Sequence, residues 1–192
     1  MRKIVLIGAG GHCKSVIDVI EKDGYFEIIG ILDKNYKSLK NVLGYPILGD
    51  DSLLTSIKKK CDNAFVSIGS SELSNLREEK YNFLKKVGFR VPSIISPNAY
   101  VSDHSKIGTG TIIMHFAQVN ADSEVGVNCI INSGSLIEHD SFIGDHSHVS
   151  TNAVINGNVE VGRGCFIGSN STIKHGITIK EKSFIKASSL IK

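Results

Sequence analysis

The chain has 192 residues, of which 41% are hydrophobic and 21% are charged, a composition typical of globular proteins and unlike that of disordered or collagen-like chains. Its 22 Lys and Arg residues against 19 Asp and Glu residues leave a net charge of +3, too dilute for a surface that binds nucleic acid. No apolar run approaches the roughly 18 residues that a membrane span needs, and no signal peptide is recognisable, so we expect a cytoplasmic protein.

The N-terminal half alternates segments with strand and helix patterns. Strands are predicted over residues 3–7, 26–32, 63–68 and 89–91, and helices over residues 13–22, 51–60 and 71–86. Such alternation predicts a small parallel sheet with helices on both faces. Val91-Pro92-Ser93 is a natural boundary, so we expect a Rossmann-like domain over residues 1–92.

The segment Gly8-Ala9-Gly10-Gly11-His12 joins the first predicted strand to the first predicted helix. Free N–H groups and the helix dipole favour an anion at such a place. Asp33, at the end of the second strand, could accept a hydrogen bond from a ribose or sugar hydroxyl. Cys13 stands where a dinucleotide-binding loop would have glycine, so a phosphorylated or nucleotide-linked small molecule is favoured over a dinucleotide. The alternative is a tight turn that merely leads into a helix.

The C-terminal half repeats with a period of six residues. Every sixth residue from Ile95 to Ile191 is Ile or Val, without an insertion. The place three residues later favours Asn, Asp or Gly, which tolerate a left-handed backbone, and the place after that favours small residues that suit crowded interior corners. Each hexad is therefore predicted to be a short strand plus a bend, and stacked hexads would form a parallel β-helix over residues 93–192.

Position within the hexad singles out His139 among the seven histidines. Its side chain should project outward, and residue 157, one 18-residue coil further, is Gly157, which would leave open space above the imidazole and an N–H able to stabilise an oxyanion. Asp140 could orient or acidify this site, or it could simply be a bend residue.

Outward positions also predict an oligomer. The column that contains His148 is otherwise apolar (Ile112, Ile130, Phe166, Phe184), and a neighbouring column is also fairly apolar. Two apolar faces and one polar face suit three prisms packed around a threefold axis, which would place His148 near a subunit junction. The four cysteines have no CxxC spacing and the histidines no metal-ligand spacing, so we expect free thiols and no metal.

Taken together, the Gly8–His12 loop, Ile68-Gly69, Ile137-Glu138-His139-Asp140 and Ser147-His148-Val149-Ser150 resemble the bacterial sugar acetyltransferases of the bacillosamine and sialic-acid O-acetyltransferase type. The resemblance implies an α/β Rossmann-like domain followed by an all-β, left-handed parallel β-helix of three hexads per coil. It also implies acetyl-CoA as the donor and an amino sugar, usually nucleotide-linked, as the acceptor.

The same resemblance assigns roles to individual residues. His139 would be the general base, supported by Asp140, and an imidazole suits that task at neutral pH. The set that would contact acetyl-CoA is His148, Gly157, Ser169 and Ala187. The set that would hold the sugar nucleotide is Gly11, His12, Cys13, Asp33, Lys34 and Gly69.

The expected function is therefore homotrimeric acetyl transfer from acetyl-CoA to the 4-amino group of a UDP-linked deoxyamino sugar, for surface glycan or nonulosonate synthesis, with active sites between subunits. Two alternatives stay open. One is O-acetylation of a sialic-acid-like sugar, in which His139 would deprotonate a hydroxyl. The other is a non-catalytic scaffold that binds sugar nucleotides.

Overall fold

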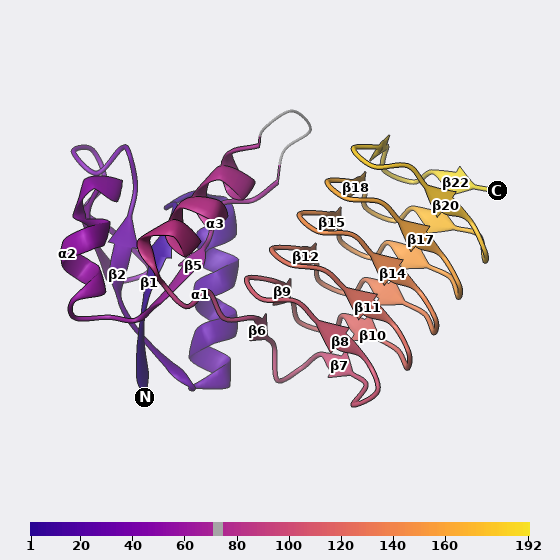
Figure 1. The fold of residues 1–192 in the computed structure, drawn as a ribbon, viewed down its shortest axis with the longest axis horizontal. Coiled ribbons are helices and arrows are strands. Elements are labelled where there is room, and N and C mark those ends of the chain that lie inside the picture. The colour runs from indigo at the N-terminus through magenta and orange to yellow at the C-terminus, as the bar shows by residue number, and fades with distance from the viewer. Residues whose placement is uncertain (71–74) are drawn as a thin grey trace. The chain divides into compact units, whose positions relative to one another are not determined.

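The computed structural model describes residues 1–70 and 75–192 (Figure 1). The chain divides into two compact units, Met1–Pro92 and Ser93–Lys192, which are described separately here. No helix in the described ranges is long and apolar enough to cross a membrane.

The described part of the first unit forms one five-stranded sheet in the order β3-β4-β2-β1-β5 (Figure 1). Its strands are β1 (Arg2–Ile7), β2 (Phe26–Leu32), β3 (Asn41–Val42), β4 (Tyr45–Gly49) and β5 (Asn63–Val66). Strands β1, β2, β4 and β5 run parallel, whereas β3 pairs antiparallel with β4. The apolar run in β1 is fully buried from Ile4 to Leu6, as a central parallel strand requires.

The purely parallel sheet predicted from the sequence is therefore wrong at its β3 edge. Strands β3 and β4 were not predicted because Gly44, Pro46 and Gly49 indicate turns, and a proline argues against a strand that is paired on both sides, as β4 is. The predicted strand over residues 89–91 is only an isolated bridge between Asn63 and Arg90.

Three α-helices and a short 3₁₀ helix accompany this sheet: α1 (Gly11–Asp23), η1 (Asp51–Leu53), α2 (Leu54–Lys58) and α3 (Leu76–Val87). Helix α1 buries an apolar face and ends at Gly24, whose left-handed φ of 69° stops the helix. Gly88 ends α3 in the same way, with φ of 92°. The helix predicted over residues 71–86 begins at Leu76, and its first four residues lie outside the described ranges.

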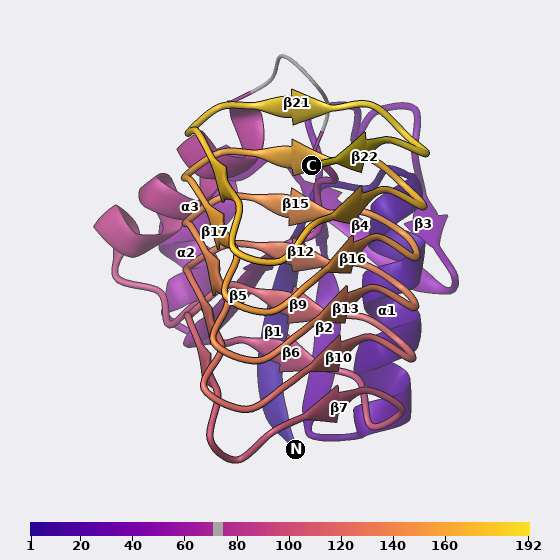
Figure 2. The ribbon, with the colours of Figure 1, turned by 90° about the vertical axis from the view of Figure 1, so that its right-hand side faces the viewer.

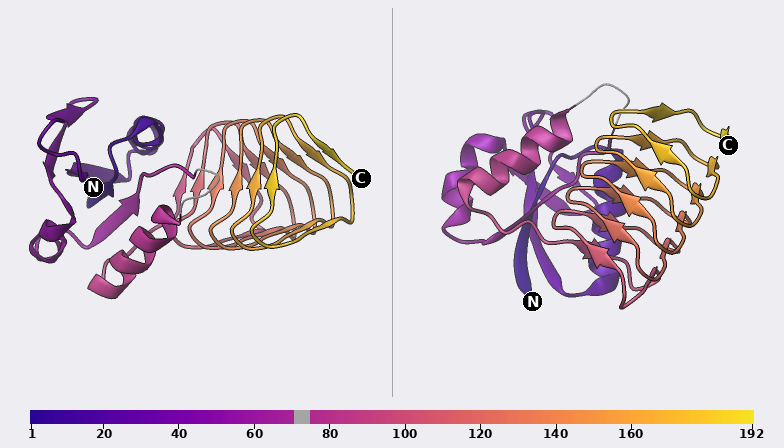
Figure 3. Two further views of the ribbon diagram at one scale, coloured as in Figure 1. Left: turned by 90° about the horizontal axis from the view of Figure 1, so that it is seen from above. Right: turned by 45° about the vertical axis from the view of Figure 1, so that its right-hand side comes forward.

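The second unit is a parallel β-helix made of three sheets (Figures 2 and 3). The first sheet contains β6 (Ile94–Ile95), β9 (Ile112–Ile113), β12 (Ile130–Ile131), β15 (His148–Val149), β18 (Phe166–Ile167) and β21 (Phe184–Ile185). The second contains β7 (Tyr100–Val101), β10 (Gln118–Val119), β13 (Leu136–Ile137), β16 (Val154–Ile155), β19 (Thr172–Ile173) and β22 (Leu190–Ile191). The third contains β8 (Lys106–Ile107), β11 (Glu124–Val125), β14 (Phe142–Ile143), β17 (Glu160–Val161) and β20 (Thr178–Ile179).

The pairing register confirms the predicted coil of 18 residues. Ile130 pairs with His148, Leu136 with Val154, and Phe142 with Glu160, each exactly one coil apart in sequence. The predicted inward column forms the core of this unit, in which the Ile and Val side chains from residue 113 to residue 173 are fully or almost fully buried.

The corners also follow the predicted hexad pattern, with one exception. Most of the predicted Asn, Asp and Gly bends have positive φ, but Asn98 does not, and its N–H instead donates a hydrogen bond to Ser96 Oγ (3.0 Å). Phe116 and His146 take positive φ at the same hexad place. The corner geometry, rather than residue preference alone, therefore dictates the left-handed backbone there.

Candidate functional site

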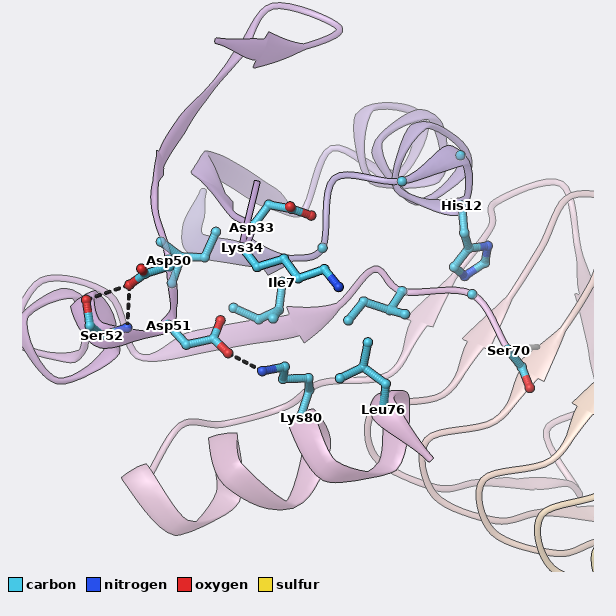
Figure 4. Close-up of a pocket in the computed structure, with 16 residues that line it drawn as sticks. Ile7, His12, Asp33, Lys34, Asp50, Asp51, Ser52, Ser70, Leu76 and Lys80 are labelled. Atoms are coloured by element: carbon cyan, nitrogen blue, oxygen red, sulfur yellow. Dashed lines mark hydrogen bonds and ion pairs between the residues drawn. The ribbon is translucent and has the colours of Figure 1, made fainter. Parts of the chain in front are cut away.

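A pocket of about 580 Å³ lies at the carboxyl edge of the sheet in the first unit (Figure 4). It collects the segments that follow β1, β2, β4 and β5, together with the start of α1 and α3. Its lining includes the predicted residues Gly11, His12, Asp33, Lys34 and Gly69. Ligands of open α/β sheets commonly bind at this edge.

The loop after β1 leaves donors free at the start of α1. Gly10 precedes the helix without a side-chain cap, and the first turn carries no acidic residue. A Cβ built on Gly10 or Gly11 would meet no atom within 4 Å, so a ligand can approach this backbone closely. By contrast, a Cβ on Gly8 would lie 2.3 Å from Ile68 Cγ1, and its φ of 102° also requires glycine.

Asp33 is bound to the backbone. Its Oδ2 accepts a hydrogen bond from the Ala9 N–H at 2.8 Å, and its Oδ1 accepts one from the Asn35 N–H at 2.7 Å. Both oxygens therefore hold the two loops that border the pocket, after β1 and after β2. The carboxylate is built to shape the pocket, in addition to any contact with a ligand hydroxyl.

Cys13 does not line the pocket. Its side chain is fully buried, and this burial raises the pKa of the thiol. The Cys13 N–H donates to Gly10 O at 3.1 Å, so the backbone donor is also occupied. Cys13 faces the core because of its position on α1, and the structure gives no ligand contact for it.

The residues that follow β4 line the pocket but were not predicted from the sequence. Asp50, Asp51 and Ser52 line the pocket beside Lys80 of α3, which forms an ion pair with Asp51 (Figure 4). Asp50 accepts hydrogen bonds from both the N–H and the hydroxyl of Ser52, which lower the pKa of its carboxyl. Recognising β4 as a parallel strand would have revealed these residues, since Asp50 directly follows its carboxyl end.

A second candidate site lies on the β-helix, at the corner between the second and third sheets. His139 Nδ1 is 2.6 Å from Asp140 Oδ2, and 60% of the histidine side chain and 54% of the aspartate side chain are exposed. The hydrogen bond to Asp140 raises the pKa of the imidazole above its ordinary value, with a smaller electrostatic contribution from the same carboxylate. Asp140 also has the bend conformation, with φ of 59°, so it is both a bend residue and a partner of His139.

Gly157 lies directly over the His139 ring. A Cβ at residue 157 would be 2.8 Å from both Cε1 and Nε2 of His139. The space that was predicted to be open above the imidazole is thus filled by the imidazole itself. At Gly144 the backbone of the next coil excludes a Cβ, whereas at Gly157 it is the His139 side chain that lies in the place of a Cβ.

The other residues predicted to contact acetyl-CoA lie away from Gly157. His148, on β15 of the first sheet, is 8% exposed and packs edge-on against Phe166, with ring centroids 4.9 Å apart. Ser169 and Ala187 occupy the corner between the first and second sheets, where the Ser188 N–H donates to Ser169 O at 2.8 Å. Within one chain, none of these three residues lies at the corner that holds His139 and Gly157.

The described residues contain no group of three or more His, Cys, Asp or Glu side chains placed to hold a metal ion. The four cysteines are buried and free.

Comparison with known proteins identifies both units. Residues 3–83 match the PglD N-terminal domain, and residues 140–175 match the bacterial transferase hexapeptide repeat family (six repeats). A perosamine N-acetyltransferase variant from Caulobacter crescentus, solved with CoA and GDP-perosamine, is 30% identical and has a TM-score of 0.94. The alignment covers 100% of this chain and 89% of that one. The chain belongs to the hexapeptide-repeat sugar acetyltransferases.

A second structure supports membership in these sugar acetyltransferases. The acetyltransferase domain of PglB from Neisseria gonorrhoeae is 29% identical, with a TM-score of 0.92 and coverage of 100% of this chain and 92% of that chain. The same domain has been solved with acetyl coenzyme A. The family resemblance and the fold class predicted from the sequence are thereby confirmed, including the left-handed β-helix.

Among curated proteins, the chain matches an uncharacterized protein, L142, of Acanthamoeba polyphaga mimivirus. The two are 31% identical over 123 residues, which are 64% of this chain and 23% of the viral protein. The chain thus matches less than a quarter of that relative.

Proposed function

We propose that this protein transfers the acetyl group of acetyl-CoA to the 4-amino group of a UDP-linked deoxyamino sugar, in the cytoplasm, for surface glycan or nonulosonate synthesis. The observation that carries the proposal is the exposed His139–Asp140 pair, whose imidazole packs against Gly157. The Caulobacter relative, which was solved with a nucleotide-linked amino sugar and CoA, supports the same chemistry.

In the proposed reaction, His139 Nε2 takes a proton from the acceptor amine as the amine nitrogen attacks the thioester carbonyl. The new C–N bond forms, the C–S bond breaks, and the CoA thiolate leaves and takes the proton from the His139 imidazolium, which restores the neutral base. Asp140 holds Nδ1 as the donor, which leaves Nε2 as the proton acceptor. The Gly157 N–H is the donor we assign to the oxyanion.

The separation of the two groups on the β-helix supports a shared site. His139 and Gly157 lie at the corner between the second and third sheets. His148 lies on the first sheet, and Ser169 and Ala187 lie at the corner between the first and second sheets. We propose that, in a homotrimer, the corner with His139 and Gly157 of one subunit lies beside His148, Ser169 and Ala187 of the neighbouring subunit. Exposed apolar side chains on the first two sheets, Tyr100, Phe184 and Leu190, would pack in such an assembly.

The test of the function is a screen of acetyl-CoA with UDP-linked 4-amino sugars, their GDP-linked counterparts and sialic-acid-type hydroxyl acceptors, read as thiol release. We expect turnover with a UDP-linked amine. Turnover with the GDP-linked amine alone would correct the nucleotide, and turnover only with a hydroxyl would establish the O-acetyltransferase instead. If no acceptor reacts and calorimetry detects no CoA binding while a UDP-sugar still binds, the protein is a non-catalytic scaffold.

Asp33→Asn tests the nucleotide pocket. The new amide can offer only one oxygen to the two N–H groups of Ala9 and Asn35, and its NH₂ group faces a donor. An unsatisfied donor of this kind should disorder the loop and raise the Kd of the UDP-sugar about tenfold or more. Calorimetry with the sugar nucleotide measures this, and an unchanged Kd would remove the pocket from nucleotide binding. The Kd for CoA is the internal control.

Asp140→Asn tests the role of the carboxylate through the pH profile. The hydrogen bond to Asp140 raises the pKa of His139, and the base must be neutral to act. Loss of this hydrogen bond should return the pKa of His139 towards its ordinary value, so the acidic limb of the kcat/KM profile should move to lower pH. The plateau rate should fall because the imidazole ring is less well oriented.

The matched control for this profile is Asp122→Asn, because Asp122 is an exposed bend residue at the same hexad place one coil earlier, with φ of 61°. It should keep the profile of the unmodified protein. An unmoved acidic limb in Asp140→Asn would show that Asp140 serves only as a bend residue.

A further inference from the structure

The third sheet of the β-helix carries a groove beside the catalytic corner. It has a volume of about 510 Å³ and is lined by Asp140, Phe142, Asn158, Val159, Glu160, Gly176 and Thr178. Apart from the buried Val159, the lining comes from two neighbouring columns, one of bend residues and one of outward strand residues.

Phe142 is the unusual member of this groove. The outward residues of the third sheet are otherwise charged or polar, and Phe142 pairs in register with Glu124 on one side and Glu160 on the other. Yet 42% of Phe142 is exposed. An aromatic ring between two glutamates gains little from packing in the chain itself, so a ligand that covers its face would account for it.

The groove begins one residue from His139. Asp140 lines it and at the same time accepts the hydrogen bond from His139 Nδ1 at 2.6 Å. Asn158, on the next coil, donates its N–H to His139 O at 3.0 Å. A molecule seated on Phe142 would therefore lie next to the proposed base.

The charges of the groove select among the molecules that could fill it. Asp140 and Glu160 are its two ionisable lining residues, and no lysine or arginine lines it. Two carboxylates favour an amine and hydroxyl donors, and they disfavour the carboxylate of a sialic-acid-type sugar.

We infer that this groove binds the pyranose ring of the acceptor, with the apolar face of the sugar on Phe142 and its hydroxyls donating to Glu160. This inference rests on the proposed acetyl transfer and adds the site that selects the sugar. The 4-amino group would then point towards the Asp140–His139 pair, and an acidic sugar would be rejected by charge.

The experiment compares Phe142→Ala and Glu160→Gln with Glu124→Gln. The control removes the same charge from the same column, but Glu124 does not line the groove. Glu124 forms an exposed ion pair with Lys106, and such surface pairs contribute little to stability. We expect the first two variants to raise the acceptor KM about tenfold each, with the acetyl-CoA KM unchanged and the control unaffected.

The other outcomes overturn the inference. A raised acetyl-CoA KM in Phe142→Ala would assign the groove to the donor, a changed oligomeric state would assign the ring to a subunit contact, and an unchanged acceptor KM would leave the groove without a role. Failure of the proposed function is distinct, because the unmodified protein would then acetylate no amino sugar. Thermal melting of each variant confirms that it is folded.

Discussion

His139→Ala is expected to lower kcat by about 10²- to 10⁴-fold, the usual contribution of a positioned general base. The imidazole is exposed, is held at Nδ1 by Asp140, and lies against Gly157 of the next coil. Its removal should therefore leave the fold intact and take away the proton acceptor. Initial rates of thiol release with saturating acetyl-CoA and acceptor measure the loss.

His104→Ala is the control for this variant, since His104 is an exposed histidine at the same corner of the β-helix, at the bend place two coils before Asp140. It should keep the full rate. A rate close to that of the unmodified protein in His139→Ala would end the mechanism proposed here, whatever the substrate.

The β-helix could be predicted from the sequence in detail because its register is set locally. Every hexad places one Ile or Val inward, and a slip of one residue would expose the entire column, so the count of six fixes which side chains face out. The same count of 18 predicts that Gly157 lies over His139, as the structure shows. The 18-residue period predicts which residues stack on one another but not their side-chain rotamers. It therefore does not predict that the imidazole fills the space at Gly157.

The first unit was harder to predict because its edge depends on tertiary pairing. In β4 the burial alternates only weakly and the strand contains Pro46, so nothing local distinguishes it from a loop; its pairing with β2 makes it a strand. Missing β4 meant missing Asp50 and Asp51 at the pocket. Cys13 was assigned through the family resemblance, which does not show that its side chain faces the core from α1.

Gly157→Ala is expected to lower kcat about 10²-fold, a loss typical of a catalytic group displaced by about 1 Å. The added Cβ would lie 2.8 Å from Cε1 and Nε2 of His139, so the ring has to move away from its position. Alanine keeps the backbone N–H, which means that a lost oxyanion donor cannot explain the effect. Single-turnover rates with bound acetyl-CoA measure it without interference from product release.

A double-mutant cycle decides whether the glycine acts through the histidine. If it does, Gly157→Ala should cost about 10²-fold in the unmodified protein and almost nothing in the His139→Ala background, where no ring remains to be displaced. The same loss in both backgrounds would mean that residue 157 acts on acetyl-CoA directly, and a raised acetyl-CoA KM would accompany it. The cycle thus separates a glycine that makes room for the base from one that lines the coenzyme groove.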